Sequence, residues 1–110
     1  MLKDSHNLFT NQSISNSTVY SQIVDVGDYH GFAIQAIWTG ASANGSLIVE
    51  TSVDKINFEP EPDSQVTILG AGHTMINLEK RYYRYFRMAV TSLDANPISM
   101  YAISISKGAR

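Results

Sequence analysis

Residues 79–90, EKRYYRYFRMAV, gather the side chains of this chain that are best suited to bind a ligand. Three arginines are interleaved with three tyrosines and one phenylalanine. Single-stranded nucleic acid binds such a pattern, because cations pair with its phosphates and flat rings stack on its bases. The whole chain, however, has 8 Lys and Arg against 10 Asp and Glu, and a net charge of −2. Because general nucleic-acid binders carry a basic excess, we expect no nucleic-acid partner.

The same stretch also fits a β-strand with one apolar face. The alternation of a strand places three apolar side chains on one face, namely Phe86, Met88 and Val90. The opposite face then carries Tyr83, Tyr85 and Arg87. Hydroxyl and guanidinium groups stay in water there, with the arginine stem against a ring. RNA-recognition strands need Gly or Ala between their exposed aromatics, which this stretch lacks, so we favour a core strand over a nucleic-acid platform.

Catalytic and metal-binding patterns are missing from the sequence. The chain has no cysteine, which excludes disulfides, thiolate zinc sites and cysteine nucleophiles. No ligand spacing relates the three histidines, His6, His30 and His73. Nor does the sequence contain a nucleophile elbow, a phosphate-binding glycine loop or a dinucleotide fingerprint. We therefore predict a protein that is not an enzyme and that holds no cofactor or metal.

One acidic loop leaves a metal alternative open. Residues 59–64, EPEPDS, place three carboxylates close together, at Glu59, Glu61 and Asp63. Carboxylates and backbone carbonyls are the ligands of Ca²⁺, although a loop of this kind is more often simply solvated. We expect the loop to be solvated.

Short strands separated by turn residues account for most of the chain. Period-two alternation and β-branched residues predict strands near residues 18–26, 30–39, 46–53, 65–69, 73–78, 79–90 and 96–107. The segment 40–45, GASANG, ends in Asn44-Gly45 and predicts a hairpin. Helical periodicity is not sustained anywhere. Seven to eight short strands favour an all-β fold, an antiparallel β-sandwich of the jelly-roll or Ig-like kind.

The apolar stripes of these strands predict the core. We expect eight side chains to be largely buried: Phe32, Ile34, Trp38, Leu47, Val49, Phe86, Met88 and Val90. No apolar run is long enough to span a bilayer or to act as a signal peptide, so we expect no membrane partner.

The last strand is apolar on both faces. One face carries Ile98, Met100 and Ala102. The other face carries Tyr101, Ile103 and Ile105. Because a two-layer sandwich buries only one face of each sheet, something else must cover the second face. The N-terminal segment and another subunit are the two candidates.

The N-terminal residues 1–17 are polar and rich in Ser and Asn. We expect them to form an arm outside a single sandwich domain at residues 18–110. An ordered arm needs a surface to lie against. We therefore predict that Leu8 and Phe9 anchor it on a neighbouring subunit or on a larger shell.

Several short segments of the chain resemble the sequences of a group of small bacteriophage proteins. They are TVYSQIVDVGDY, FAIQAIWTG, GSLIVETSVDKINFEP, YYRYFRMAV and a final ISISKG, which lie between residues 18 and 108, and the resemblance as a whole covers about residues 8–108. The group comprises β-sandwich virion proteins, including capsid cement and decoration proteins. The resemblance implies a non-enzymatic subunit in the virion that forms homo-oligomers, most often trimers, and contacts capsid or tail proteins.

One turn of this chain departs from the pattern of that group, and one sequence pattern also fits another class of protein. The group usually has Asp-Gly in the reversal after Val53, whereas this chain has Asp54-Lys55. Lysine tolerates a positive φ poorly, so we expect the left-handed position at Asn57, or a turn of another type. The sequence pattern S-x-D-x-x-x-F also occurs in carbohydrate-binding β-sandwich domains. The alternative is thus a glycan- or receptor-binding module that stacks a sugar on Trp38 or on the Tyr83/Tyr85 pair.

Overall fold

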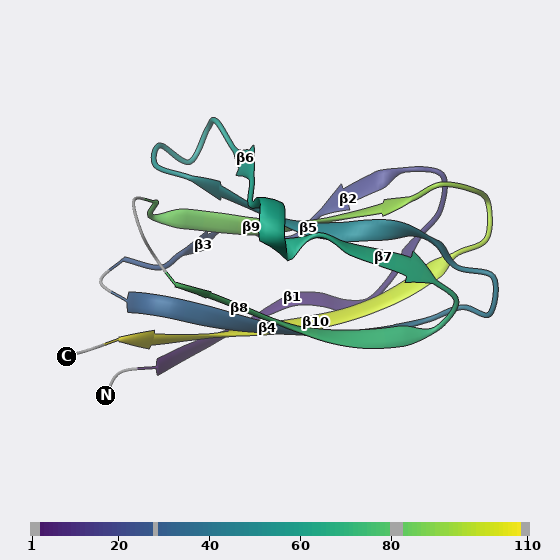
Figure 1. The fold of residues 1–110 in the computed structure, drawn as a ribbon, viewed down its shortest axis with the longest axis horizontal. Coiled ribbons are helices and arrows are strands. Elements are labelled where there is room, and N and C mark those ends of the chain that lie inside the picture. Colours follow the sequence, from purple (N-terminus) through teal and green to yellow (C-terminus); the bar gives the residue numbers. More distant parts are fainter. Residues whose placement is uncertain (1–2, 28, 80–82, 109–110) are drawn as a thin grey trace.

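The fold is a sandwich of two antiparallel sheets (Figure 1). The computed structural model describes residues 3–27, 29–79 and 83–108. The four-stranded sheet has the order β1 (Lys3–Ile14), β10 (Ile98–Gly108), β4 (Tyr29–Thr39), β8 (Gly72–Glu79). The six-stranded sheet has the order β2 (Thr18–Tyr20), β9 (Tyr85–Ser92), β5 (Asn44–Ser52), β6 (Glu59–Pro60), with β3 (Val24–Asp25) on β9 and β7 (Val66–Leu69) on β5. The predicted antiparallel β-sandwich is confirmed.

Helical structure is limited to one turn among the described residues. It is the 3₁₀ helix η1 (Pro62–Ser64), which begins at a proline, as helices commonly do. No helix in that part of the chain is long and apolar enough to cross a membrane.

All eight side chains predicted for the core are buried, with exposed fractions of 5% or less. The rings of Phe32 and Phe86, one from each sheet, stack with their centroids 3.9 Å apart. The Trp38 indole N–H donates to the Gly70 carbonyl oxygen at 3.0 Å, which satisfies the polar atom of this buried ring. The core therefore lies between the two sheets, as the alternating stripes predict.

The hairpin predicted at residues 40–45 is wrong. Strands β4 and β5 belong to different sheets, so their connection is an arch over the end of the sandwich. Its turn uses Gly40, at φ 131°, and the Ala43 N–H donates to the Gly40 carbonyl oxygen. Asn44 and Gly45 already lie in β5, where Gly45 pairs with Ser92 on one side and Ile68 on the other.

The N-terminal segment is a strand of the sandwich instead of an arm outside it. Strand β1 pairs with β10 from Lys3↔Lys107 to Ile14↔Ile98, with two bulges. The bulges interrupt the alternation, so that the consecutive residues Leu8 and Phe9 are both buried, at 6% and 5% exposure. In the single chain these two side chains pack in their own core, so burying them requires no neighbouring subunit.

The strand predicted at residues 18–26 is divided in two. β2 and β3 both pair with β9, and Ser21 bridges the interval between them. The Ser21 N–H donates to the Met88 carbonyl oxygen, and the Met88 N–H donates to Ser21 Oγ, both at 2.8 Å. A buried side-chain hydroxyl thus takes the place of a backbone carbonyl oxygen as the hydrogen-bond acceptor at this point of the sheet.

Candidate functional site

The outer face of the four-stranded sheet carries several large apolar side chains that the described residues leave exposed. On β10, Ile98, Met100 and Ala102 are buried between the sheets. The alternate side chains Tyr101, Ile103 and Ile105 are 50%, 40% and 42% exposed. The two apolar faces predicted for this strand are therefore present, and the described part of the chain does not cover the second one.

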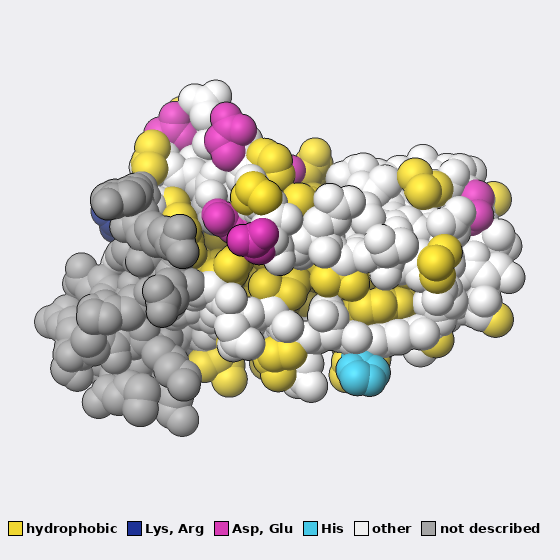
Figure 2. All heavy atoms as spheres, in the orientation of Figure 1, with side chains coloured by type: hydrophobic (Ala, Val, Ile, Leu, Met, Phe, Trp, Pro, Cys, Tyr) yellow, Lys and Arg dark blue, Asp and Glu magenta, His cyan; other side chains and the backbone are white. Residues whose placement is uncertain are grey.

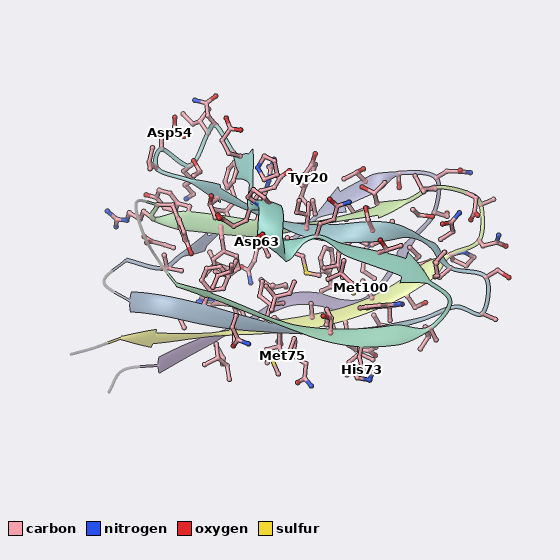
Figure 3. The ribbon with its side chains drawn as sticks, viewed as in Figure 1. Tyr20, Asp54, Asp63, His73, Met75 and Met100 are labelled. Carbon is pink, nitrogen blue, oxygen red and sulfur yellow. The ribbon has the colours of Figure 1, made fainter. Side chains whose placement is uncertain are left out.

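Two residues that the sequence did not single out extend this surface. Ile37 lies opposite Tyr101 on β4 and is 48% exposed. Met75 follows on β8, opposite Gln35, and is 56% exposed. Figure 3 shows Met75 and His73 pointing away from the six-stranded sheet. We call Ile37, Met75, Tyr101, Ile103 and Ile105 the apolar face.

A shallow depression of about 240 Å³ lies on the apolar face beside the bulges of β1. It is lined by Asn7, Phe9, Thr10, Gln35, Ile37, Tyr101, Ala102 and Ile103. The lining combines apolar surface with amides and a hydroxyl, and it carries no charge. A depression of this kind accepts one apolar side chain, or one small polar ring, from a partner.

The outer face of the six-stranded sheet is organised by Arg87. Its guanidinium lies over the rings of Tyr20 and Phe58, 4.0 and 4.2 Å from their centroids. Arg87 Nε also donates to Glu50 Oε1 at 2.7 Å, across the β5–β9 pair. The arginine is thereby held between two rings and neutralised by one carboxylate, since a guanidinium can stack and form ion pairs at the same time.

The predicted face of Tyr83, Tyr85 and Arg87 is only partly correct. Tyr85 and Arg87 share the outer face of β9, and Arg84 lies over the Tyr85 ring. Tyr83 precedes the strand and packs against the core, with its ring edge-on to Phe32 at 6.3 Å. The alternation holds only from the first residue of β9, and this is why Tyr83 was misplaced.

This arrangement disfavours the nucleic-acid platform. Arg84 donates to both carboxylate oxygens of Asp25 at 3.1 Å, and Arg87 is paired with Glu50. Both arginines thus contact carboxylates of their own chain, which lowers their attraction for phosphate. Residues 80–82, which belong to the same sequence pattern, lie outside the described residues.

Two further alternatives from the sequence find no site. Trp38 is 5% exposed and packs between the sheets, as the core prediction has it, so it offers no ring surface for the sugar-stacking alternative. Across residues 3–27, 29–79 and 83–108, no three His, Cys, Asp or Glu side chains lie close enough together to hold a metal ion.

The reversal after Val53 places Lys55, instead of Asn57, in the left-handed region, at φ 68°. The Asp54 carboxylate compensates by accepting the backbone N–H groups of Asn57 and Ile56 at 2.8 and 2.9 Å. It also accepts the Asn57 side-chain N–H and the Ser52 hydroxyl. These four donors, with the Asn57 backbone first, hold the pKa of Asp54 well below its usual range.

Replacing Lys55 by glycine is expected to raise the free energy of unfolding by about 0.5–1 kcal/mol. Glycine removes the Cβ strain at positive φ, and this gain exceeds the extra chain entropy of the unfolded state. Urea denaturation with an unchanged slope measures the effect. Gln65→Gly is the control, because Gln65 has an ordinary φ of −75° and its replacement should lower stability. A lowered stability for Lys55→Gly would show that the turn does not need the left-handed conformation.

Comparison with known proteins finds similarity in fold. No family model and no curated protein matches the chain in sequence. The SPBc2 prophage-derived protein YomS is 11% identical, with a TM-score of 0.56 and 96% coverage of each chain. The PBSX exported protein XepA is 16% identical, with a TM-score of 0.69 over 97% of this chain and 37% of XepA. A protein of the T13 particle of infectious bursal disease virus is 6% identical, with a TM-score of 0.66 over 97% of this chain and 31% of that one.

Proposed function

We propose that this protein is a non-enzymatic structural subunit of a bacteriophage virion, a capsid decoration or cement protein or a head or tail accessory subunit. It acts through protein–protein contacts made by the apolar face. The observation that carries the proposal is that five large apolar side chains, each at least 40% exposed, gather on one face of one sheet. Contiguous exposed apolar surface on a soluble domain marks an interaction site.

The fold supports this role. One of the similar structures is a prophage-derived protein, another is the PBSX exported protein XepA, and the third comes from a viral particle. If β2 with β3 and β6 with β7 are counted as single strands, the eight strands divide evenly between the sheets. Most connections then cross between the sheets, whereas Ig-like sandwiches pair several successive strands within one sheet. We infer a jelly roll, an architecture common in viral capsid domains.

The chemistry of the apolar face suits a protein partner. Polar side chains accompany it on the same side of the sheet: Asn7 on β1 and His73 and Asn77 on β8 lie at its border, and Gln35 lies within it, between Ile103 and Met75. A tyrosine among aliphatic residues inside a polar rim is the usual composition of a binding centre. The partners we propose are other copies of this chain, in a trimer, and capsid or tail proteins.

Ile103→Glu tests the proposal. Burying a carboxylate in the middle of the apolar face costs free energy, so we expect the oligomer to dissociate. We also expect the occupancy, the number of copies of this protein bound to each purified virion particle, to fall at least about tenfold. Sedimentation measures the mass, and quantitative gel analysis of purified particles measures the occupancy. Ile56→Glu is the matched control, because Ile56 is 80% exposed in the turn after β5 and lies off the face. If both variants assemble like the parent, the apolar face is not the contact surface.

Glycan or receptor binding is the second candidate, and one observation favours it. Tyr101 is half exposed beside a depression that also offers the side-chain amides of Asn7 and Gln35. An aromatic ring with adjacent amides suits a sugar ring. A glycan array separates the two candidates: binding that is lost in Tyr101→Ala and retained in Tyr101→Phe would favour the glycan role.

A further inference from the structure

The two edges of the four-stranded sheet differ in how they are protected. The β1 edge has two bulges, and Asn11 there has a φ of 51°. Such irregularities keep a foreign strand from pairing. The β8 edge pairs with β4 without a register shift, from Gly31↔Glu79 to Trp38↔Gly72. Its sequence, GHTMINLE, contains no proline, lysine or arginine. Strand β8 therefore has no bulge, no proline and no lysine or arginine side chain to block pairing at its edge.

The outer side of β8 has unused hydrogen-bonding capacity. In an antiparallel pair, alternate residues bond to the partner strand and the others direct N–H and C=O groups away from it. Apart from its pairing with β4, β8 makes no backbone hydrogen bond to another described residue. These groups are thus available to another strand.

A groove of about 400 Å³ runs beside this edge, between β8 and the segment formed by η1 and β7. Figure 2 shows hydrophobic side chains along the seam between the two layers at this side of the molecule, with acidic side chains above it. The groove is lined by Glu61, Asp63, Ser64, Val66 and residues 74–78. Strand β7 thus leaves the β8 edge accessible.

We propose that β8 pairs antiparallel with β8 of a second copy of this chain, about a twofold axis at Met75. The two four-stranded sheets would then become one continuous sheet of eight strands. This edge contact differs from the proposed face contact, and it does not depend on a virion location.

The side chains of β8 suit such self-pairing. With the axis at Met75, the outer face pairs Met75 with its own copy and His73 with Asn77. On the inner face Thr74 lies opposite Ile76. No like charges oppose each other in this register, and cross-strand apolar pairs stabilise a sheet. Because Met75 belongs to the apolar face and lies at its edge, pairing also joins the apolar faces of two copies into one surface. That continuity favours a second copy over an unrelated peptide.

Electrostatics predicts the salt dependence of this contact. Glu61 and Asp63 line the groove next to the edge, so two copies bring their carboxylates to the same seam. Their repulsion is screened by salt, and apolar burial is not. Association of two copies through β8 should therefore strengthen as the ionic strength rises. Binding of a basic extended peptide in the same groove would instead weaken as the ionic strength rises, because salt screens its attraction to the carboxylates.

Single-cysteine cross-linking tests the proposal. Because the chain has no native cysteine, every disulfide that forms must involve the introduced residue. Met75→Cys under mild oxidation should form disulfide dimers at least about tenfold faster than Ile56→Cys, because directly opposed residues of antiparallel strands lie about 4.5–5.5 Å apart at Cα, within the range of a disulfide. A mixture of His73→Cys and Asn77→Cys should cross-link faster than either variant alone. Equal rates for Met75→Cys and Ile56→Cys, with no fast mixed pair, would overturn the proposal.

Two further measurements separate this inference from the proposed function. Ile103→Glu lies on β10, with β4 between it and β8, so adding it to Met75→Cys should leave cross-linking unchanged while particle occupancy falls. Raising salt from about 0.05 to about 0.5 M should increase the Met75→Cys rate, because the Debye length falls severalfold. A rate that falls with salt would overturn self-pairing.

Discussion

Gly45→Ala is expected to lower the free energy of unfolding by at least about 3 kcal/mol. A Cβ atom at Gly45 would overlap the Thr91 carbonyl oxygen and lie 3.2 Å from Ser92 Cα. Both atoms belong to the backbone of β9, so no side-chain rotation can relieve the clash. The strands β5 and β9 must separate locally, which breaks ladder hydrogen bonds at this end of the β5–β9 pair. Denaturant unfolding followed by circular dichroism measures the loss.

Gly70→Ala is the control for this prediction. Gly70 has a φ of 73°, and an added Cβ there meets no atom closer than 3.6 Å. Its replacement carries only the strain of a left-handed alanine, about 1–2 kcal/mol. If Gly45→Ala were no more destabilising than Gly70→Ala, the close approach of β5 to β9 would be incorrect.

Phe86→Ala is expected to lower the free energy of unfolding by about 3–5 kcal/mol. Phe86 is fully buried, and its ring stacks on Phe32 with an angle of 3° between the planes. Truncation leaves a cavity between two sheets that are held apart by their other side chains, so the core cannot close around it. The midpoint of urea unfolding, at an unchanged slope, reports the loss.

The neighbouring tyrosine provides the matched comparison. Tyr85 is half-buried on the opposite face of the same strand, where it contacts Arg84 and Lys55. Its replacement by alanine should cost less than about 1.5 kcal/mol, since only exposed cation–π contacts and partial burial are lost. Equal losses for the two variants would mean that the two faces of β9 are wrongly assigned.

The two outer faces of the sandwich differ in a way that bears on function. On the six-stranded sheet, Arg87 is engaged by Glu50, Tyr20 and Phe58 of the same chain. On the four-stranded sheet, Tyr101 and its apolar neighbours are exposed to solvent in the single chain. A partner gains more binding free energy by covering the four-stranded sheet, because burying that surface breaks no existing ion pair. This asymmetry directs the proposed contacts to the four-stranded sheet and to its β8 edge.

The sequence by itself determined the fold class, the eight core side chains predicted from alternation and the two-faced last strand. Successive side chains of a strand point to opposite faces whatever the strand pairs with, so Phe86 and Met88 could be assigned to the core from alternation alone. The same local rule placed Tyr101 and Ile103 on a second apolar face. These properties depend only on residues close together in the chain.

The tertiary structure decided which strands are neighbours and in what register. Strand β1 joins the sandwich because bulges turn both Leu8 and Phe9 inward, which alternation cannot foresee. Gly45 faces the β9 backbone, although Asn44-Gly45 is typical of a hairpin turn. Ile37 meets Tyr101 across 64 residues of chain, and only strand pairing could bring the two together. The extent of the apolar face and the free β8 edge follow from such long-range pairing, since both depend on which strands of the sheet lie side by side.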